Sequence, residues 1–390
     1  MTRSAGDGAP PPGPEPHKGL SKGLPKDHPR DIAKDLPKDL PKDLPKGRSR
    51  RNFAGARPVM DDVARLAGVS KQTVSRVLND NPAVRPETRE AVRTAMRTLG
   101  YRPSRSARSL ASGRTRMLGV ISFDAARFGP ASILTAINTA AQEAGYLVSS
   151  IALDTADRAT VVRAVDTLSA EGADGVIAIA PQRWVGRALA EAHLDTPLMV
   201  LENDLGKDAS FVTADNRAGA RMATEHLLDL GHTTVRHIAG PLGWLSADRR
   251  VEAWRATLRA AGAPVHEPLI GDWSADSGYE LGRGLAGRSD VTAIFASNDQ
   301  MALGVLRALH ESGRHVPDDV SVVGYDDIPE AAHLLPPLTT VRTDFAEIGT
   351  RSLRLLLSQL DGPPEPAPNQ VVPVELIVRR STGGAPNRRP

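Results

Sequence analysis

The segment Met60–Asn79, MDDVARLAGVSKQTVSRVLN, constrains the fold more than any other stretch of the chain. Apolar residues repeat at helical spacing up to Gly68, which is placed to end a first helix. Ser70 is placed to cap a second helix, Lys71–Asn79, whose outward face is polar. The side chains that we expect this face to present to DNA are Lys71, Gln72, Thr73, Ser75, Arg76 and Asn79. Because such donors suit the base edges and phosphates of the major groove, the segment predicts a helix-turn-helix. The alternative is a plain helical hairpin with a solvated polar face.

A third helix and an arginine-rich segment follow this motif. Residues 85–87, Arg-Pro-Glu, begin the helix with proline at an early position and an acid in the first turn, and Gly100 ends it. Tyr101 and Arg105 then precede Leu110, which is the one large apolar residue of the basic segment. A segment of this kind can fold on DNA and insert an apolar wedge into the minor groove. Tyr101, Arg105 and Leu110 are therefore further predicted DNA contacts.

Residues 58–113 resemble the DNA-binding headpiece and hinge of the lactose-repressor (LacI/GalR) family. The matching words are DVARLAGVS, QTVSRVLN, TRE, LGYRPS and ARSLASG, and their spacing is continuous. The resemblance implies that Lys71, Gln72 and Arg76 contact bases and that Leu110 is the hinge wedge. The family often has Ser or Thr just before the third helix, where this chain has Arg85.

Composition limits the classes of function. The 390 residues are enough for several domains with ordinary cores. The net charge is only +3, but arginine is dense between residues 85 and 116, which favours contacts with nucleic-acid phosphates. The absence of cysteine excludes disulfides and thiolate sites. We find neither a long apolar run for a membrane span nor the apolar core of a signal peptide, so we expect a cytoplasmic protein.

Residues 1–57 form a segment of different composition. It is rich in Pro, Gly, Lys and Asp, and it repeats a Lys-Asp-Leu-Pro unit. Frequent proline blocks helix formation and the few leucines cannot bury a core, so we predict a disordered tail. Two alternatives are a basic arm that helps to hold DNA and a misassigned start of the chain.

From Met117 onward, strands and helices alternate in two series, which predicts parallel sheets covered by helices in two lobes. This part resembles the family's effector domain, which is similar to a periplasmic sugar-binding protein. The fold class that we predict is thus an all-α helix-turn-helix headpiece plus a two-lobed α/β domain with parallel sheets. The predicted boundaries are a disordered tail at 1–57, the headpiece at 58–103, a hinge helix and linker at 104–116, the ligand-binding and dimerisation domain at 117–382, and a disordered end at 383–390.

Some candidate ligand-binding residues come from the rule that open parallel sheets bind ligands beyond the carboxyl ends of their strands, and these are Asp124, Glu202, Asn298 and Asp326. Three further candidates are Arg250 and Trp273 of the second lobe and Phe345, which follows the crossover between the lobes. Carboxylates, amides and an arginine guanidinium bind hydroxyl pairs, and aromatic faces cover a sugar ring. This set favours a sugar over a phosphate or a planar base.

Each candidate also has a purely structural interpretation. Asn298 caps the next helix, Asp326 binds loop amides, Arg250 pairs with a surface acid such as Glu252, Trp273 is a core residue, and Glu202 is solvated. The family resemblance favours a ligand role for Arg250, Trp273, Asn298 and Asp326, which lie in the matching words SADRR, GDWSADSG, ASNDQMALG and DVSVVGYDD. Glu202 and Thr343 depart from the family pattern.

The resemblance implies a transcription regulator, most simply a repressor of sugar-utilisation genes that a small sugar releases from operator double-stranded DNA. A homodimer would present two recognition helices to a pseudo-palindromic site. Alternatives are a sensor of a purine or phosphorylated sugar acting as corepressor, a transport-type binding protein, and an architectural DNA binder with a vestigial sensor lobe. The ten histidines have no metal-binding spacing, and we find neither a nucleophile elbow nor a phosphate loop, so we expect no enzyme activity, cofactor or metal.

The assembly expected from the sequence is a dimer. The terminal residues STGGAPNRRP cannot supply the apolar seam of a coiled coil, so we do not expect a tetramer held together by C-terminal heptad helices. The predicted dimer surface includes the helix Ala131–Ala144 and part of the helix Gln300–Ser312. In the second helix, Met301, Leu303, Val305 and Leu306 are more apolar than one buried stripe requires. The alternative is that this excess belongs to the core.

Overall fold

The structure, a computed structural model, describes residues 58–102, 114–153, 157–180, 182–191, 196–201, 211–362 and 370–386. The chain forms two compact units, residues 1–101 and residues 102–390, and each is considered by itself. The predicted tail at 1–57 lies outside the described residues, and so do Arg105, Leu110 and Glu202.

The first unit contains the three predicted helices, α1 (Met60–Leu66), α2 (Lys71–Leu78) and α3 (Pro86–Leu99). Ser70 caps α2, because its hydroxyl oxygen accepts the Thr73 N–H at 3.2 Å. Arg85 precedes α3 and provides no side-chain cap. The three helices enclose a small core of Val63, Ala64, Val74, Val77, Val92 and Ala95. The helix-turn-helix prediction is confirmed. The apolar faces of α1 and α2 are buried against α3 in this core.

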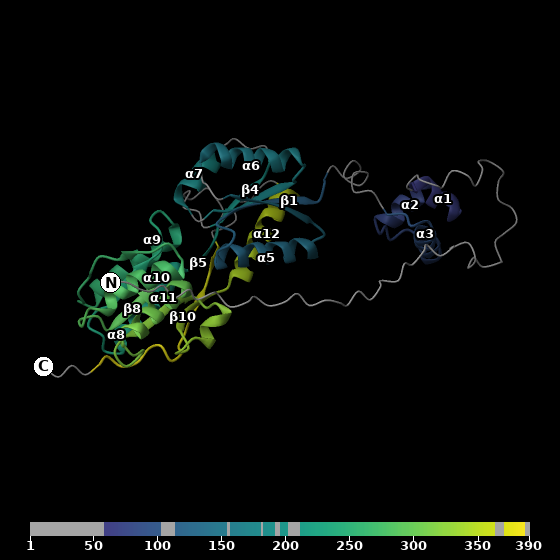
Figure 1. Cartoon of the computed structure of the whole chain (residues 1–390). Helices are drawn as coiled ribbons and strands as arrows, with labels where there is room; N and C mark the ends of the chain where they lie inside the picture. The colour runs from purple at the N-terminus through teal and green to yellow at the C-terminus, as the bar shows by residue number, and fades with distance from the viewer. Residues whose placement is uncertain are drawn as a thin grey trace, which may run out of the picture. The chain divides into compact units, whose positions relative to one another are not determined.

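The first lobe of the second unit is a parallel sheet with helices on both faces. Its strands are β1 (Met117–Phe123), β2 (Leu147–Leu153), β3 (Gly175–Ile179) and β4 (Leu198–Leu201), in the order β2-β1-β3-β4. Its helices are α5 (Phe128–Glu143), α6 (Arg158–Ala170), α7 (Arg183–Glu191) and the returning α12 (Phe345–Asp361). Helices α5 and α12 cover one face, and α6 and α7 cover the other (Figure 1).

The second lobe repeats this plan around a larger sheet of order β12-β10-β9-β8-β6-β7. Its strands are β6 (Arg236–Ala239), β7 (Leu269–Ile270), β8 (Ala293–Ala296), β9 (Ser321–Asp326), β10 (Thr339–Thr343) and β12 (Val374–Ile377), of which β12 is antiparallel. Its helices are α8 (Asn216–Asp229), α9 (Leu245–Ala260), α10 (Ala275–Ala286), α11 (Asp299–Glu311) and a short 3-10 helix, Pro329–His333. Helices α8 and α9 share one core with the sheet, and α10 and α11 share the other.

The chain passes between the lobes through short segments. Strand β5 (Val212–Ala214) pairs with β11 (Gln370–Val372), and α12 leaves β10 to pack against α5 in the first lobe. Helix α12 thus brings the chain back to the first lobe. The sequence interpretation missed α7, β5, β7 and the 3-10 helix. Strands as short as β5 and β7 have too few residues to produce a periodic pattern.

The structure favours the core alternative for most of the apolar excess of α11. Met301 and Val305 are fully buried and Leu306 is 6 % exposed, all within the second lobe, whereas Leu303 is 41 % exposed. The reason is the close packing of α10 on α11: a Cβ at Gly304 would lie 2.0 Å from the Ala275 carbonyl oxygen. The excess apolar residues of α11 thus cover a second helix, and only Leu303 remains available for a partner surface.

Candidate functional site

The outward face of α2 is polar and open. Lys71, Gln72, Arg76 and Asn79 are exposed, and Thr73 and Ser75 are half-buried. Val74 and Val77 on the opposite face are buried in the headpiece core. The helix is therefore held from one side only, which leaves the donors of the other side accessible to a duplex.

Two of the predicted DNA contacts also have structural roles. Lys71 lies 3.3 Å from Asp61, but both side chains are more than half exposed, so this ion pair holds Lys71 only weakly. Tyr101 packs against the core of the headpiece. The DNA contacts of all these residues remain predictions.

A cavity of about 410 Å³ lies in the second unit, where the two lobes face each other. Six of the predicted ligand residues line it: Asp124, Arg250, Trp273, Asn298, Asp326 and Phe345. Its first-lobe wall is largely apolar, with Phe128, Ile133, Ile179, Ala180 and Leu201. The second lobe supplies most of the polar groups.

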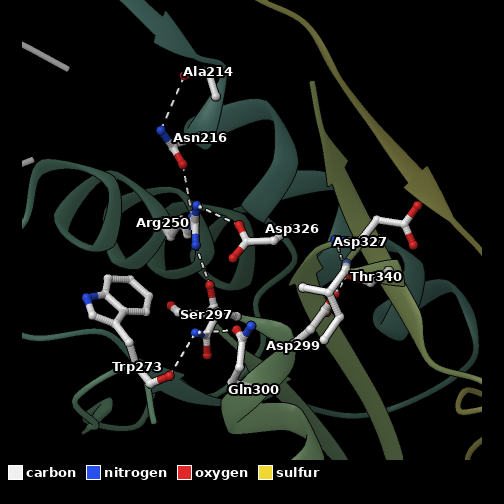
Figure 2. Close-up of polar contacts among 12 residues, drawn as sticks. Ala214, Asn216, Arg250, Trp273, Ser297, Asp299, Gln300, Asp326, Asp327 and Thr340 are labelled. Carbon is white, nitrogen blue, oxygen red and sulfur yellow. Dashed lines mark hydrogen bonds and ion pairs between the residues drawn. The ribbon is translucent and has the colours of Figure 1, made fainter. Parts of the chain in front are cut away.

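Arg250 is the most constrained polar side chain of the cavity. It is 5 % exposed, and its Nε–H donates to Asn216 Oδ1 at 2.9 Å while Nη1 donates to the Ser297 carbonyl (Figure 2). Its Nη2 lies 3.7 Å from Asp326 Oδ1, and its guanidinium lies 3.5 Å from the centre of the Tyr325 ring. The proposed surface pair with Glu252 is wrong, because Glu252 pairs with Arg217 at 2.5 Å. Burial and these partners fix the guanidinium at the cavity wall.

Asp326 ends β9 and Asp327 follows it, and their side chains diverge. Asp326 pairs with Arg250, whereas Asp327 accepts from Arg342 and Arg379, each at 2.7 Å. Both residues have positive φ angles, 104° and 53°. The two adjacent carboxylates therefore have separate partners and do not face each other as a pair.

Asp299 is a fully buried acid behind the cavity. Its carboxyl oxygens accept the Thr340 hydroxyl at 2.6 Å (Figure 2) and the Ile328 N–H at 2.9 Å. Burial, with the charge of Asp326 next in importance, raises the pKa of Asp299 to about 8. This carboxyl is therefore largely protonated at neutral pH.

Asn298 and Trp273 each have a structural role and also line the cavity. Asn298 Oδ1 accepts the Met301 N–H and caps α11, while Nδ2 donates to the Trp273 carbonyl and to Gln300. Trp273 is 7 % exposed and belongs to the second-lobe core, and Gly240 leaves room for its ring. Its Nε1–H is buried without a hydrogen-bond partner among the described residues. Asn298 thus holds the backbone of Trp273 in place at the cavity wall.

The sequence interpretation missed several residues of the cavity, namely Arg127, Phe128, Trp244, Ser246 and Gln300. Phe128 and Phe345 meet edge to face with their ring centres 5.7 Å apart, and Trp244 meets Trp273 in the same way at 5.5 Å. These five residues lie in the loop or first helical turn after a predicted strand, whereas other missed lining residues, such as Ser274 and Ile133, do not. Extending the search from the first residue after each strand to the start of the next helix would have found the five.

Comparison with known proteins identifies the family. Residues 59–104 match the family model "Bacterial regulatory proteins, lacI family", and residues 224–382 match "Periplasmic binding protein-like domain". The lactose operon repressor of Escherichia coli (strain K12) is 38 % identical over 324 residues, which cover 82 % of this chain and 89 % of that protein. This chain belongs to the LacI family.

Solved structures support the LacI-family fold. The structure of the Lac repressor dimer bound to operator and the anti-inducer ONPF has a TM-score of 0.77 at 35 % identity, covering 84 % of this chain and 100 % of that one. The structure of the transcriptional regulator CelR in complex with cellobiose has a TM-score of 0.63 at 35 % identity, covering 83 % and 100 %. The predicted fold class is thus confirmed, and this LacI-family chain is a DNA-binding transcription regulator.

Two negative findings hold for the part of this LacI-family chain that the structure describes. No helix there has the length and apolar character needed to cross a membrane. Within the same residues, no group of three or more histidine, aspartate or glutamate side chains is placed to hold a metal ion.

Proposed function

We propose that this chain is a cytoplasmic, sugar-responsive repressor that binds operator double-stranded DNA as a homodimer. In this proposal residues 58–103 are the DNA-binding headpiece, 104–116 the hinge, and 117–382 the effector and dimerisation domain. The observation that carries the proposal is the cavity in which Arg250 and Asp326 face aromatic side chains. Hydroxyl-binding groups beside flat apolar faces suit a sugar ring, which has polar edges and apolar faces.

The charges of the cavity favour an uncharged ligand. Asp124 and Asp326 are both at its wall, and the guanidinium of Arg250 is already paired with Asp326. The described lining thus holds two carboxylates and two guanidinium groups, those of Arg127 and Arg250, so its formal charge is balanced and offers a dianionic phosphate no net attraction. This balance supports a sugar over a phosphorylated one.

The distribution of polar groups provides the coupling to DNA. The second lobe holds most of the hydrogen-bonding groups, and the first lobe, which follows the hinge in the chain, presents an apolar wall. A ligand between them favours one arrangement of the lobes, and its binding must then weaken operator binding by the same factor by which operator weakens ligand binding. The named relatives are a lactose operon repressor and a transcriptional regulator in complex with cellobiose. Regulation rather than catalysis is accordingly the role that we assign.

Titration of the full chain with lactose, cellobiose, ribose, guanine and glucose 6-phosphate tests this proposal. The expected result is binding of at least one unphosphorylated sugar, and release by that sugar of a DNA site selected from random sequence. Binding of the purine or the phosphorylated sugar alone, with tighter DNA binding in its presence, would establish a corepressor instead. Binding of none of the five would leave the cavity without its proposed role.

Replacing Arg76 by alanine should weaken binding to the selected DNA site by about 1–3 kcal/mol and relax its sequence preference. Arg76 is exposed on the outward face of α2, where its guanidinium can donate two hydrogen bonds to a base edge. Fluorescence anisotropy with selected and random DNA measures both effects. Arg97→Ala is the matched control, because Arg97 is an exposed arginine in the last turn of α3 that pairs with Glu90. An equal loss on selected and random DNA would exclude base reading by Arg76.

A further inference from the structure

The turn that carries Trp244 forms one wall of the cavity. Trp244 directly precedes α9, and its side chain provides no cap for that helix. Its ring lines the cavity and meets the Trp273 ring edge to face. The ring also packs against the second-lobe core, so the turn 243–248 is held both from within that lobe and by contacts from outside it.

The first lobe supplies the contacts from outside. Gln182 pairs with Trp244 in an isolated antiparallel bridge, and the Arg183 N–H donates to the Gly243 carbonyl at 3.1 Å. The Arg183 guanidinium also donates to Asp248 Oδ2 at 3.2 Å. Arg183 begins α7 in the first lobe, whereas Asp248 lies in the first turn of α9 in the second. One residue of the first lobe thus holds both ends of the turn, and we name this set of contacts the inter-lobe latch.

A second contact crosses the cleft beside the inter-lobe latch. Phe128 begins α5 in the first lobe, yet it packs against the apolar core of the second lobe. The two lobes are therefore closed on each other around the cavity. In this closed arrangement the Arg183 side chain adds an electrostatic contact to apolar and backbone contacts that do not need it.

We propose that Arg183 is a positioning residue for effector binding, which fastens the Trp244 wall across the cleft and slows the opening of the lobes. This inference rests on the proposed function, in which the cavity binds the effector. Arg183 is not among the residues that line the cavity, and we infer that it acts through Asp248 and Trp244. The side chains of Arg183 and Asp248 are 42 % and 27 % exposed, so we expect a change of about two- to fivefold in the ratio of closed to open molecules.

Single-molecule fluorescence energy transfer between the lobes measures this ratio directly. The natural sequence has no cysteine, so Asp166→Cys on α6 and Arg259→Cys on α9, both exposed, give two specific labelling sites. Arg183→Ala and Asp248→Ala should each lower the closed-to-open ratio about two- to fivefold. The double variant Arg183→Asp with Asp248→Arg should restore it, and Arg183→Lys should restore part of it. At about 1 M salt, where charges are screened beyond about 3 Å, the variants should converge on the wild type.

Arg217→Ala is the matched control, because Arg217 pairs with Glu252 of the same helix α9 but from α8 within the second lobe. It should leave the ratio unchanged. If Arg183→Ala behaves as this control does, or if the charge-swapped variant fails to recover, Arg183 does not fasten the lobes.

A second arm uses lactose, cellobiose and ribose as probes. For any of them that binds the wild type, the dissociation rate should rise in Arg183→Ala by the same factor by which the ratio falls. An unchanged dissociation rate would show that the inter-lobe latch does not position the effector site. If none of the three sugars binds, the sugar-responsive function fails, while the distance measurement still decides whether Arg183 fastens the Trp244 turn.

Discussion

Replacing Arg250 by alanine should lower the free energy of unfolding by about 3–5 kcal/mol and abolish the response to effector. The buried guanidinium binds Asn216 and the Ser297 carbonyl, pairs with Asp326 and lies on the Tyr325 ring. Its removal leaves the Asp326 charge and the Asn216 amide buried without these partners, which costs far more than the loss of an exposed ion pair. Urea unfolding followed by circular dichroism measures the stability change.

The lysine variant separates stability from function. Arg250→Lys keeps a positive charge near Asp326, so its loss of stability should be smaller, but an ammonium cannot reproduce the planar contacts with Asn216 and Ser297. Operator binding should persist in this variant, because the headpiece has a core of its own. Arg255→Ala on the same helix is the control, since its partner Glu267 is 93 % exposed and the pair should contribute less than about 1 kcal/mol. An Arg250→Lys protein that still releases DNA at the wild-type sugar concentration would remove Arg250 from the effector site.

Local patterns were sufficient to predict most of the fold. The spacing of apolar residues and the placing of Gly68, Ser70 and Gly100 set the headpiece helices within a residue or two. Local patterns also predicted most of the alternating strands and helices of the lobes, because each element buries one face against a neighbour that follows soon in the chain. The strand-end rule located three residues that share the cavity, Asp124, Asn298 and Asp326, for a related reason, since parallel strands end at one edge of a sheet.

Contacts between distant segments were not predictable in this way. Arg249 and Arg250 are neighbours, and nothing local indicates that Arg250 rather than Arg249 becomes buried against Tyr325 and Asp326 of β9. The apolar excess of α11 likewise has no local sign that α10 will cover it. The inter-lobe latch depends on how far the lobes close, which is a tertiary property that neither α7 nor α9 encodes alone.

Replacing Asp299 by asparagine should stabilise the protein above neutral pH. The ordinary pKa of this carboxyl is 3.8, and burial with the nearby Asp326 charge raises it to about 8 in the folded chain. Between these two values the folded state binds more protons than the unfolded state, so stability falls as pH rises, by about 1.4 kcal/mol per pH unit for one full proton. The neutral amide can still accept the Ile328 N–H and donate to the Thr340 hydroxyl. We therefore expect Asp299→Asn to be more stable than the wild type by about 2–4 kcal/mol at pH 7.5.

The window from pH 6.5 to 8 isolates this effect. Burial lowers the pKa of His237 from its ordinary value of 6.5 to about 3. The stability that this neutral histidine contributes is therefore complete above pH 6.5 and is lost only as the pH falls from 6.5 towards 3. Across the window the wild type should lose about 2 kcal/mol relative to Asp299→Asn in urea unfolding of the full chain.

Asp290→Asn is the control, because hydrogen bonding to Arg288 lowers the pKa of that exposed acid and it stays ionised throughout the window. Parallel stability profiles for the wild type and Asp299→Asn from pH 6.5 to 8 would mean that Asp299 is ionised in the folded protein. The buried carboxylate would then place a second negative charge behind Asp326, and the cavity would favour a cationic ligand more than its visible lining indicates.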